Sequence, residues 1–450
     1  MLLALRDLRP ALPAPVRRTV VRVLATLVAA VLATTLLPTT SASAKSVSFD
    51  KRLFGVHDGR LVALTRPMTG SIRLWDMGVT WAEIERSPGV YDFARLDQIV
   101  RAAMARKVEV TLVLGITPGF YGASTNVNND TVRAAYRAYV RAVMERYRNF
   151  DGKGRGIQYY QVWNEMNVVN FWTGNFTDMG KLSQIVTQVR NTVDGGAKVV
   201  GPAFVTRYTA QLKNLTRFYF ARLDGTPVWK FMDVVSLNLY PMPKYSGRMG
   251  NPEDTMKLLA KAKVSLAAGG VPASKPIWNT EINYGMQSGS RGGTGATTIT
   301  DGRQAAYVIR TYLLNSARGI KRVFWYSYDM SYLPTGGTLG NTRLTSPANG
   351  STLTTAGKAF YLVQRWMKGK LVGPTRSSQP CTVDRAGTYT CVVKYAQGVR
   401  RIYWNPTKSV KVRLVKSASF TQTVYGVRKS AKGGSVKTVD YRPLMVRSKV

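Results

Sequence analysis

Short apolar runs alternate with longer amphipathic segments between Lys45 and about Gly369. Several of the short runs are uninterrupted stretches of valine, isoleucine, leucine and tyrosine, as expected for parallel strands that are buried on both faces. The pattern predicts eight such strands. They cover residues 54–57, 71–74, 108–114, 157–162, 197–201, 234–239, 276–278 and 323–326.

Amphipathic segments lie between these strands, and residues 131–147 give the clearest example. Their apolar side chains recur with a period of 3.6 residues, and Asp130 precedes them as the expected N-cap. Eight strands alternating with helices predict an α/β fold, the (β/α)8 or TIM barrel. An open doubly wound sheet is the alternative, although no glycine-rich fingerprint follows the first strand. Further helices are predicted at residues 96–106, 182–193, 254–268, 304–316 and 356–368.

The pattern changes beyond about Leu371, where apolar and polar residues alternate between turn-forming residues. A period of two predicts short strands and a small C-terminal domain that resembles a β-sandwich. The expected organisation is a leader at residues 1–44, a catalytic barrel at 45–370 and the β-domain at 371–450. This last segment contains 16 basic and 2 acidic side chains, so it is strongly basic.

Two cysteines, Cys381 and Cys391, flank a turn sequence within this C-terminal segment. In an exported protein such a pair predicts a disulfide across a hairpin, and two free thiols are the alternative. The chain has one histidine and no cluster of histidine and cysteine residues, so we expect neither a metal site nor a cofactor.

The first 44 residues have the three parts of a secretory signal peptide. Arg17, Arg18 and Arg22 form a basic flank, an apolar run follows, and the small residues 41–44 end before Lys45. The apolar run is shorter than the roughly 20 residues that span a bilayer. We therefore expect a secreted protein without a transmembrane anchor in the mature chain, and an uncleaved anchor is the alternative.

The charge of the chain is unusually positive. Residues 45–450 contain 59 basic and 23 acidic side chains, a net charge of +36. Such a surface attracts polyanions, and for an exported protein an anionic cell-envelope polymer is the expected partner. No nucleic-acid partner is expected, because no nucleic-acid-binding motif is present.

A glutamate follows each of two predicted strands. Residues 161–165 read Gln-Val-Trp-Asn-Glu at the end of strand four, and residues 278–281 read Trp-Asn-Thr-Glu at the end of strand seven. Active sites of (β/α)8 enzymes lie at these carboxyl ends. Two facing carboxyl groups can cleave a glycosidic bond, and a separation of about 5–5.5 Å allows one of them to attack directly. Glu165 and Glu281 are therefore the predicted catalytic residues.

These motifs resemble clan A, the large barrel clan of retaining glycoside hydrolases. Trp163-Asn164-Glu165 resembles the acid/base motif of the clan, and Thr280-Glu281 resembles its nucleophile motif. The resemblance spans roughly residues 50–370 and implies Glu165 as general acid/base and Glu281 as nucleophile. Within the clan the chain is most similar to glycoside hydrolase family 39 and its relatives, on the basis of residues 54–57, 72–75, 81–85 and 89–93.

The resemblance also assigns roles to residues around the glutamates. Asn164 is expected to bond the 2-hydroxyl of the sugar at the cleavage site. Arg73 is expected to keep Glu281 ionised, and Tyr240 to hydrogen-bond the same carboxylate. A structural ion pair is the alternative for Arg73, and core packing is the alternative for Tyr240.

Three further aromatic residues are candidates for contact with the sugar. Trp325, at the end of strand eight, is expected to form the floor under the sugar ring, because an indole face packs against C–H groups. His57 and Trp163 lie near strand ends and are candidates for binding the sugar. A place in the protein core is the alternative for all three residues.

The chain departs from the pattern of the clan at two positions. Met166 follows Glu165 where the clan usually has proline, and Asn238 precedes Tyr240 by two residues where many members have histidine. Both changes leave the glutamate pair intact, but they leave the identity of the substrate open.

The expected function is hydrolysis of an O-glycosidic bond in an extracellular or cell-envelope polysaccharide or oligosaccharide by double displacement. Three alternatives use the same features. They are a transglycosidase with the same glutamates, a non-catalytic carbohydrate-binding barrel at the cell surface, and an adhesin that binds polyanions through its basic C-terminal domain.

Overall fold

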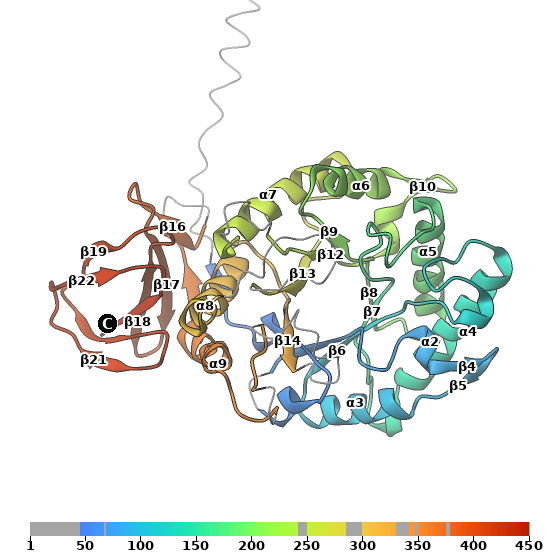
Figure 1. The fold of residues 1–450 in the computed structure, drawn as a ribbon, viewed down its shortest axis with the longest axis horizontal. Coiled ribbons are helices and arrows are strands. Elements are labelled where there is room, and N and C mark those ends of the chain that lie inside the picture. The colour runs from blue at the N-terminus through green and yellow to red at the C-terminus, as the bar shows by residue number, and fades with distance from the viewer. Residues whose placement is uncertain are drawn as a thin grey trace, which may run out of the picture.

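The computed structural model describes residues 46–66, 69–241, 250–284, 299–329, 342–346, 350–374 and 379–449. The expected leader at residues 1–44 lies outside the described residues. A barrel of strands ringed by helices lies beside a smaller all-β unit (Figure 1).

The barrel is a closed parallel sheet. Its strands follow the order β8-β7-β6-β3-β2-β14-β13-β12-β9, and a parallel bridge between Val200 and Val234 closes the circle. Each of the eight predicted strands has a counterpart, so the predicted TIM barrel is confirmed and the open sheet is excluded. The strands are β2 (Phe54–Asp58), β3 (Ser71–Leu74), β6 (Glu109–Val113), β7 (Tyr159–Gln161), β8 (Lys198–Val200), β9 (Phe204–Val205), β12 (Val235–Asn238), β13 (Ile277–Ile282) and β14 (Val323–Asp329).

Helices cover the outside of the barrel, as Figure 1 shows. The amphipathic pattern located most of them, but α6 and the four-residue α2 were not predicted. Within the described residues, no helix combines the length and apolarity needed to cross a membrane. The helices are α2 (Trp81–Ile84), α3 (Ala94–Ala105), α4 (Asp130–Tyr147), α5 (Phe176–Val193), α6 (Thr209–Phe220), α7 (Pro252–Ala268), α8 (Asp301–Ala317) and α9 (Thr355–Met367).

Helix α4 illustrates how the sequence sets these elements. Its N-cap is Asn129 rather than the expected Asp130, because the Asn129 side chain accepts the amide of Val132. Tyr136 and Tyr139 lie on its apolar stripe and are fully buried. The hydroxyl of Tyr136 donates to the carbonyls of Leu114 and Val162, at the ends of two barrel strands. The buried stripe therefore fixes the helix against the barrel.

Short hairpins and 3-10 helices complete the barrel region. The hairpins lie outside the main sheet and pair β4 with β5 and β10 with β11. These elements are β4 (Glu85–Ser87), β5 (Val90–Tyr91), β10 (Arg222–Leu223), β11 (Thr226–Pro227), η1 (Lys51–Leu53), η2 (Val62–Thr65), η3 (Gly119–Tyr121), η4 (Phe150–Gly152) and η5 (Val228–Phe231).

The C-terminal domain is an antiparallel sheet in the order β1-β15-β17-β18-β23-β20-β21, with β16 paired to β17 and a separate β19-β22 pair. A small core that includes Tyr403, Leu414 and Val439 joins the two sheets. Strand β1 (Ser46–Ser48), which the sequence pattern did not predict, adds to this sheet through β15. The other strands are β15 (Lys370–Val372), β16 (Cys381–Val383), β17 (Tyr389–Tyr395), β18 (Gly398–Trp404), β19 (Val410–Arg413), β20 (Ala418–Gln422), β21 (Arg428–Ser430), β22 (Val436–Val439) and β23 (Leu444–Ser448).

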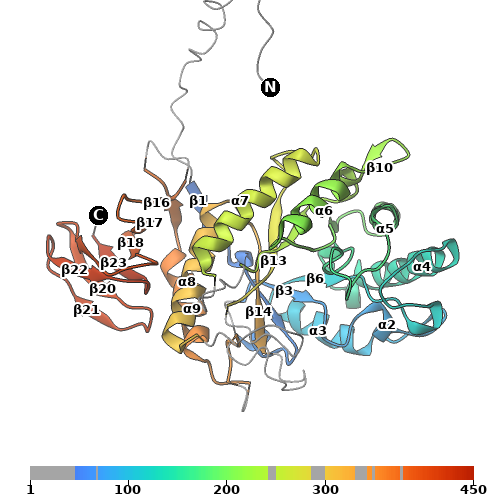
Figure 2. The ribbon, with the colours of Figure 1, turned by 45° about the horizontal axis from the view of Figure 1, so that its top comes forward.

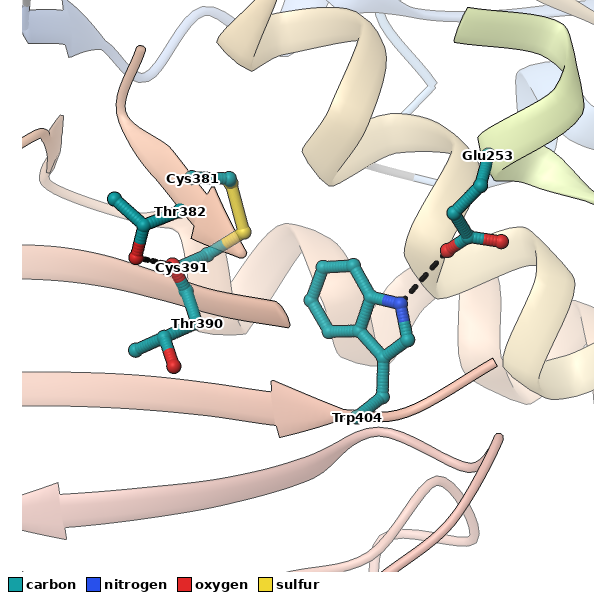
Figure 3. The surroundings of a disulfide bond; sticks show 6 residues. All are labelled: Glu253, Cys381, Thr382, Thr390, Cys391 and Trp404. Carbon is teal, nitrogen blue, oxygen red and sulfur yellow. Dashed lines mark hydrogen bonds between the residues drawn. A yellow bond between two sulfur atoms is a disulfide. The ribbon is translucent and has the colours of Figure 1, made fainter. Parts of the chain in front are cut away.

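The two cysteines form a disulfide across one antiparallel pair. Cys381 on β16 lies directly opposite Cys391 on β17, with a Cα–Cα distance of 4.3 Å (Figure 3). Thr382 and Thr390 are the next pair along the same strands. The bond therefore holds the edge strand β16 to the rest of the sheet.

A buried ion pair anchors the C-terminal domain to the barrel. The domain packs beside α8 and α9 (Figure 2). Glu253 at the start of α7 accepts a hydrogen bond of 2.7 Å from the indole of Trp404 on β18 (Figure 3). The same carboxylate pairs with Arg310 of α8, whose guanidinium also donates to the carbonyl of Tyr441. Because Glu253 and Arg310 are almost fully buried, each depends on the other for neutralisation.

Candidate active site

The predicted nucleophile Glu281 lies at the carboxyl ends of the barrel strands and accepts two hydrogen bonds. Arg73 of β3 donates through Nη1 to Oε1 at 2.7 Å, and the hydroxyl of Tyr240 donates to Oε2 at 3.0 Å. Arg73 is wholly buried and Glu281 is 6% exposed. Both donors are directed at carboxylate oxygens in a site closed to solvent, the geometry of charge-assisted hydrogen bonds.

An irregularity in β13 brings Glu281 into this position. Leu237 of β12 pairs with Asn279, but the next residue, Asn238, pairs with Glu281, so Thr280 is skipped. A bulge of this kind changes the direction of a side chain within a strand. As a result, Thr280 and Glu281, although consecutive, both reach side chains of other barrel strands, Asn238 of β12 and Arg73 of β3.

Arg73 connects the segments that carry the two glutamates. Besides Glu281, its guanidinium donates to Gln161 Oε1 at 2.7 Å and to Asn164 Oδ1 at 2.9 Å. Gln161 and Asn164 come from the end of β7, just before Glu165. The planar guanidinium fork therefore fixes the predicted acid/base segment relative to the nucleophile.

Glu165 has surroundings that differ from those of Glu281. Its backbone has φ of 38°, a left-handed conformation that side chains rarely adopt and that is often found at functional sites. Burial, and next the negative charge of Glu281, raise its pKa to about 7. The hydrogen bond of 2.9 Å from the Asn238 amide opposes this rise. Glu165 thus keeps a proton close to neutral pH.

A chain of buried hydrogen bonds links Arg73 to Glu165 through the interior of the barrel. Arg73 donates to the carbonyl oxygen of the Gln161 amide, whose Nε2 donates to the Ser236 hydroxyl at 2.7 Å. Ser236 and Thr280 share a bond of 2.7 Å, and Thr280 donates to Asn238 Oδ1 at 2.8 Å.

Arg73 can only donate and Asn238 donates to Glu165, so the two ends of this hydrogen-bond chain determine which hydroxyl donates in the middle. The proton of the Thr280 hydroxyl is used towards Asn238, so Ser236 is the donor in the bond between the two hydroxyls. Asn238 in turn donates to Glu165. Every donor therefore points from the guanidinium towards the acid/base carboxyl, an arrangement in which successive bonds polarise one another.

Two of the predicted aromatic residues are held in the interior by hydrogen bonds of their indole nitrogens. Trp325 is fully buried and donates to the carbonyl of Thr342, so it has no face open to solvent. Trp163 is also fully buried and donates to the carbonyl of Phe171. Their roles in binding a sugar stay predictions.

His57 is likewise buried, but it contacts the nucleophile strand. Its Nε2 lies 3.1 Å from the carbonyl of Thr280, which fixes the proton on this nitrogen. Burial, together with the charge of Arg73, lowers the pKa of the imidazole well below its usual value. His57 is therefore neutral and supports the backbone beside Glu281.

Tyr326 and Asp76 lie beside these residues, and the sequence analysis assigned neither of them a catalytic or sugar-binding role. The hydroxyl of Tyr326 on β14 donates to the carboxyl of Asp76, which follows β3. Burial raises the pKa of Asp76 to about 6, and the charge of Glu281 adds to this rise. Tyr326 is half-buried, unlike its neighbour Trp325. The sequence signal that could have pointed to Tyr326 is strand alternation. Adjacent residues of a strand face opposite sides, so Trp325 and Tyr326 cannot both face the site.

A cavity of about 730 Å³ lies next to Asp76. The rings of Trp75 and Phe171, 6.0 Å apart and edge to face, line one part of it. Glu83 and Arg60 are among its charged residues. Its mixture of aromatic and polar groups is typical of a small-molecule binding site.

Within the described ranges, no group of three or more histidine, cysteine, aspartate or glutamate side chains is arranged to hold a metal ion. The site consists instead of two carboxyl groups, a buried guanidinium and several aromatic or amide side chains.

Comparisons with known proteins give the fold but no family. No protein-family model and no curated protein matches the chain. Among solved structures, the chain is similar to a glucosidase from Croceicoccus marinus, with a TM-score of 0.63, 11% identity, and coverage of 90% of this chain and 98% of that chain.

Two other similar structures come from different hydrolase families. A GH30 endoxylanase from Clostridium papyrosolvens gives a TM-score of 0.56 at 12% identity, covering 90% of this chain and 98% of its own. A GH51 arabinofuranosidase from Xanthomonas axonopodis gives 0.54 at 13%, with coverage of 91% and 98%. The chain thus shares its two-part architecture with several glycoside hydrolases, and at these identities the likeness concerns the fold.

Proposed function

We propose that the chain is a glycosidase that cleaves an O-glycosidic bond by double displacement, with net retention of the anomeric configuration. The observation that supports this most strongly is the unequal environment of the two carboxyl groups. Glu281 accepts bonds from Arg73 and Tyr240, whereas burial raises the pKa of Glu165 to about 7. One group is suited to attack as an anion, and the other to donate a proton.

In the first step, Glu281 attacks the anomeric carbon and forms an ester bond to the sugar. The bond from that carbon to the leaving oxygen breaks, and the proton of Glu165 moves to this oxygen. In the second step, Glu165 removes a proton from water, the water oxygen bonds to the anomeric carbon, and the ester bond to Glu281 breaks. No cofactor is required by these two steps.

The sugar at the cleavage point would be held by groups around the carboxyl pair. Arg73 donates to Asn164 Oδ1, which orients the amide so that Nδ2 can donate to the sugar 2-hydroxyl. Tyr326 is half-buried and bonded to Asp76, so we favour it over the fully buried Trp325 as the aromatic floor.

The proposed activity is tested on a panel of β-linked oligosaccharides. The measured quantity is the rate at which reducing ends are released. Glu165→Gln should lower kcat about 10²–10⁴-fold, since proton donation contributes that much. Glu281→Gln should abolish turnover. Glu145→Gln on the exposed face of α4 is a matched control that should retain wild-type activity. Turnover by Glu281→Gln at the wild-type rate would refute the mechanism.

The stereochemistry of the first-formed product gives an independent test of the double displacement. Proton NMR of the fresh product should show the anomeric configuration of the substrate, and the opposite configuration would exclude the covalent step. The same experiment with an added sugar acceptor separates hydrolysis from transfer. A larger yield of transfer product than of hydrolysis product would identify a transglycosidase.

We also propose that the protein is exported and held at an anionic cell-envelope polymer through its C-terminal domain. Residues 379–449 carry 15 basic and 2 acidic side chains. Within the described part of this domain, Arg442 and Asp440 form an ion pair, so most of the positive charge is not neutralised. Binding to a polyanion should weaken as salt is added, and salt-independent binding would contradict this proposal.

The clan A motifs support placing the chain among the retaining barrel glycosidases. The first and second strands, with the segment at residues 81–93, favour family 39 and its relatives within that clan. Because the likeness to solved structures concerns the fold, the sugar and the linkage must come from the glycan panel.

A further inference from the structure

Arg207, which follows β9, is a charged residue at the site with no part in the mechanism described above. Its guanidinium carbon lies 4.9 Å from the centre of the Tyr240 ring, and Tyr240 donates to Glu281. The positive charge of Arg207 also acts on Glu165, where it opposes the rise in pKa. Arg207 therefore lies over a residue that binds Glu281, and its charge reaches Glu165.

Arg207 differs from Arg73 in its partners. Arg73 is paired with Glu281, whereas Arg207 forms no ion pair with any acid in the part of the chain that the structure describes. Its Nε is buried and has no hydrogen-bond partner among those residues. A guanidinium cannot lose its proton, and the Arg207 side chain is only partly exposed, so its positive charge lies at the site without an acidic partner among the described residues. An anionic group on the substrate would supply the complement.

We propose that Arg207 binds a carboxylate on the sugar that leaves, so that the enzyme cleaves glycans with a uronic acid on the leaving side of the bond. This inference rests on the proposed function, because it uses Glu165 as the proton donor. The leaving oxygen must lie beside Glu165 to receive its proton, and the leaving sugar is then within reach of the neighbouring Arg207.

The chemistry of the surroundings favours a carboxylate on this side. A planar guanidinium binds a planar carboxylate through two parallel hydrogen bonds, and the Tyr240 ring supports the plane of the Arg207 side chain. In contrast, the cavity beside Trp75 is lined by two acids, Asp76 and Glu83, and by two arginines, Arg60 and Arg95, so its charges are mixed. Arg207, which has no acidic partner among the described residues, therefore marks the side of the site that favours a carboxylate.

Pairs of substrates that differ only in the carboxyl group test this proposal. The probes are oligosaccharides of hyaluronan, chondroitin and glucuronate-substituted xylan, each with its carboxyl-reduced counterpart. We expect at least one acidic probe to be cleaved with kcat/KM about 10-fold or more above that of its reduced form. Equal or higher kcat/KM for every reduced form would overturn the proposal.

Variants locate the preference at Arg207. In Arg207→Gln the ratio of kcat/KM for the acidic probe to kcat/KM for the reduced probe should fall towards one. The change should appear mainly in KM, because Arg207 would bind the carboxylate equally in the ground state and in the transition state. Arg207→Lys should keep an intermediate ratio, since it keeps the charge but loses the fork. Lys213→Gln, an exposed charge loss on α6, is the matched control and should keep the wild-type ratio.

A role for Arg207 confined to tuning Glu165 predicts a different result. In that case Arg207→Gln would shift the pH profile for acidic and reduced probes alike and would leave their ratio unchanged. This outcome would overturn the carboxylate site while leaving the proposed mechanism intact.

Binding to the Glu281→Gln variant separates failure of this inference from failure of the proposed function. Calorimetric titration of that variant with the same probes requires no turnover. Tighter binding of an acidic probe, lost when Arg207→Gln is added, supports the carboxylate site even if wild-type enzyme cleaves nothing. Equal binding of all acidic and reduced probes, together with turnover of neutral glycans, would refute the site and retain the glycosidase.

Discussion

The hydrogen bond from Asn238 to Glu165 gives a direct test of how the site controls its proton donor. In the proposed mechanism Glu165 must carry a proton, so kcat/KM should fall as the pH rises through its pKa of about 7. Asn238→Leu removes the donor that stabilises the ionised form. The pKa of Glu165 should therefore rise, and the basic limb of the pH profile should move to higher pH.

The size of this shift follows from the bond itself. A hydrogen bond to a charged group contributes about 1.5–3 kcal/mol, and one pKa unit corresponds to about 1.4 kcal/mol. Allowing for water that enters beside the leucine, we expect a shift of about one unit. At about pH 8, kcat/KM relative to its own maximum should rise about fivefold, from roughly 9% to roughly 50%.

The assay is the pH dependence of kcat/KM with the best glycan from the panel, measured between about pH 4 and pH 9. Asn279→Leu is the control, because Asn279 is another fully buried asparagine of a barrel strand but bonds to Asn315 rather than Glu165. Its basic limb should stay in place. Thr280→Val breaks the polar chain one step earlier and should give a smaller shift in the same direction. An Asn238→Leu profile with an unchanged or more acidic basic limb would refute the reasoning.

Three further predictions concern stability. Glu253→Gln should lower the free energy of unfolding by about 3–5 kcal/mol in urea melts at neutral pH, because it leaves Arg310 charged and buried. An unchanged urea midpoint would show that this ion pair does not stabilise the contact between the two domains. Burial raises the pKa of Asp58 to about 7 from 3.8, so its folded form holds a proton that the unfolded chain releases, and stability is lost as the pH rises from about 4 to about 7. Asp58→Asn should remove this pH dependence. The free energy of unfolding of the variant should therefore rise relative to that of the wild type by about 4 kcal/mol at most between these pH values. A difference between the two proteins that does not change with pH would contradict the assignment. Replacing Cys381 and Cys391 by alanine should lower the free energy of unfolding by about 2–3 kcal/mol relative to the oxidised wild type. The reason is that the unfolded chain gains conformational entropy when the disulfide no longer closes its loop.

Hydrophobic periodicity located the eight barrel strands because each is a short, mainly apolar run between longer amphipathic segments. The same reasoning missed α6, where the strongly exposed Phe220 interrupts the contrast between the two faces of the helix. Strand β1 was missed because its three residues, Ser46–Ser48, become a strand only by pairing with β15. That pairing joins residues more than 320 positions apart, and no local pattern encodes it.

Local motifs were enough to place Glu165, Glu281 and Asn164 at the carboxyl ends of the barrel, since each stands at the end of a recognisable strand, while their roles stay predictions. The choice of Trp325 over Tyr326 depended on which face of β14 lines the barrel, and the register of neighbouring strands decides that. Arg207 could not be singled out among many arginines, because its distinguishing property is the lack of an acidic partner in three dimensions.

The polar interior of the barrel explains how two chemically identical side chains receive different tasks. Glu281 lies against the buried positive charge of Arg73, which it contacts directly. Glu165 accepts a bond from the Asn238 amide instead, the charge of Arg73 acts on it from a distance, and it also experiences the negative charge of Glu281. The proton of the pair therefore belongs on Glu165. Because every donor of the connecting chain points towards Glu165, the chain also limits how far its pKa can rise, and the group remains able to release its proton near neutral pH.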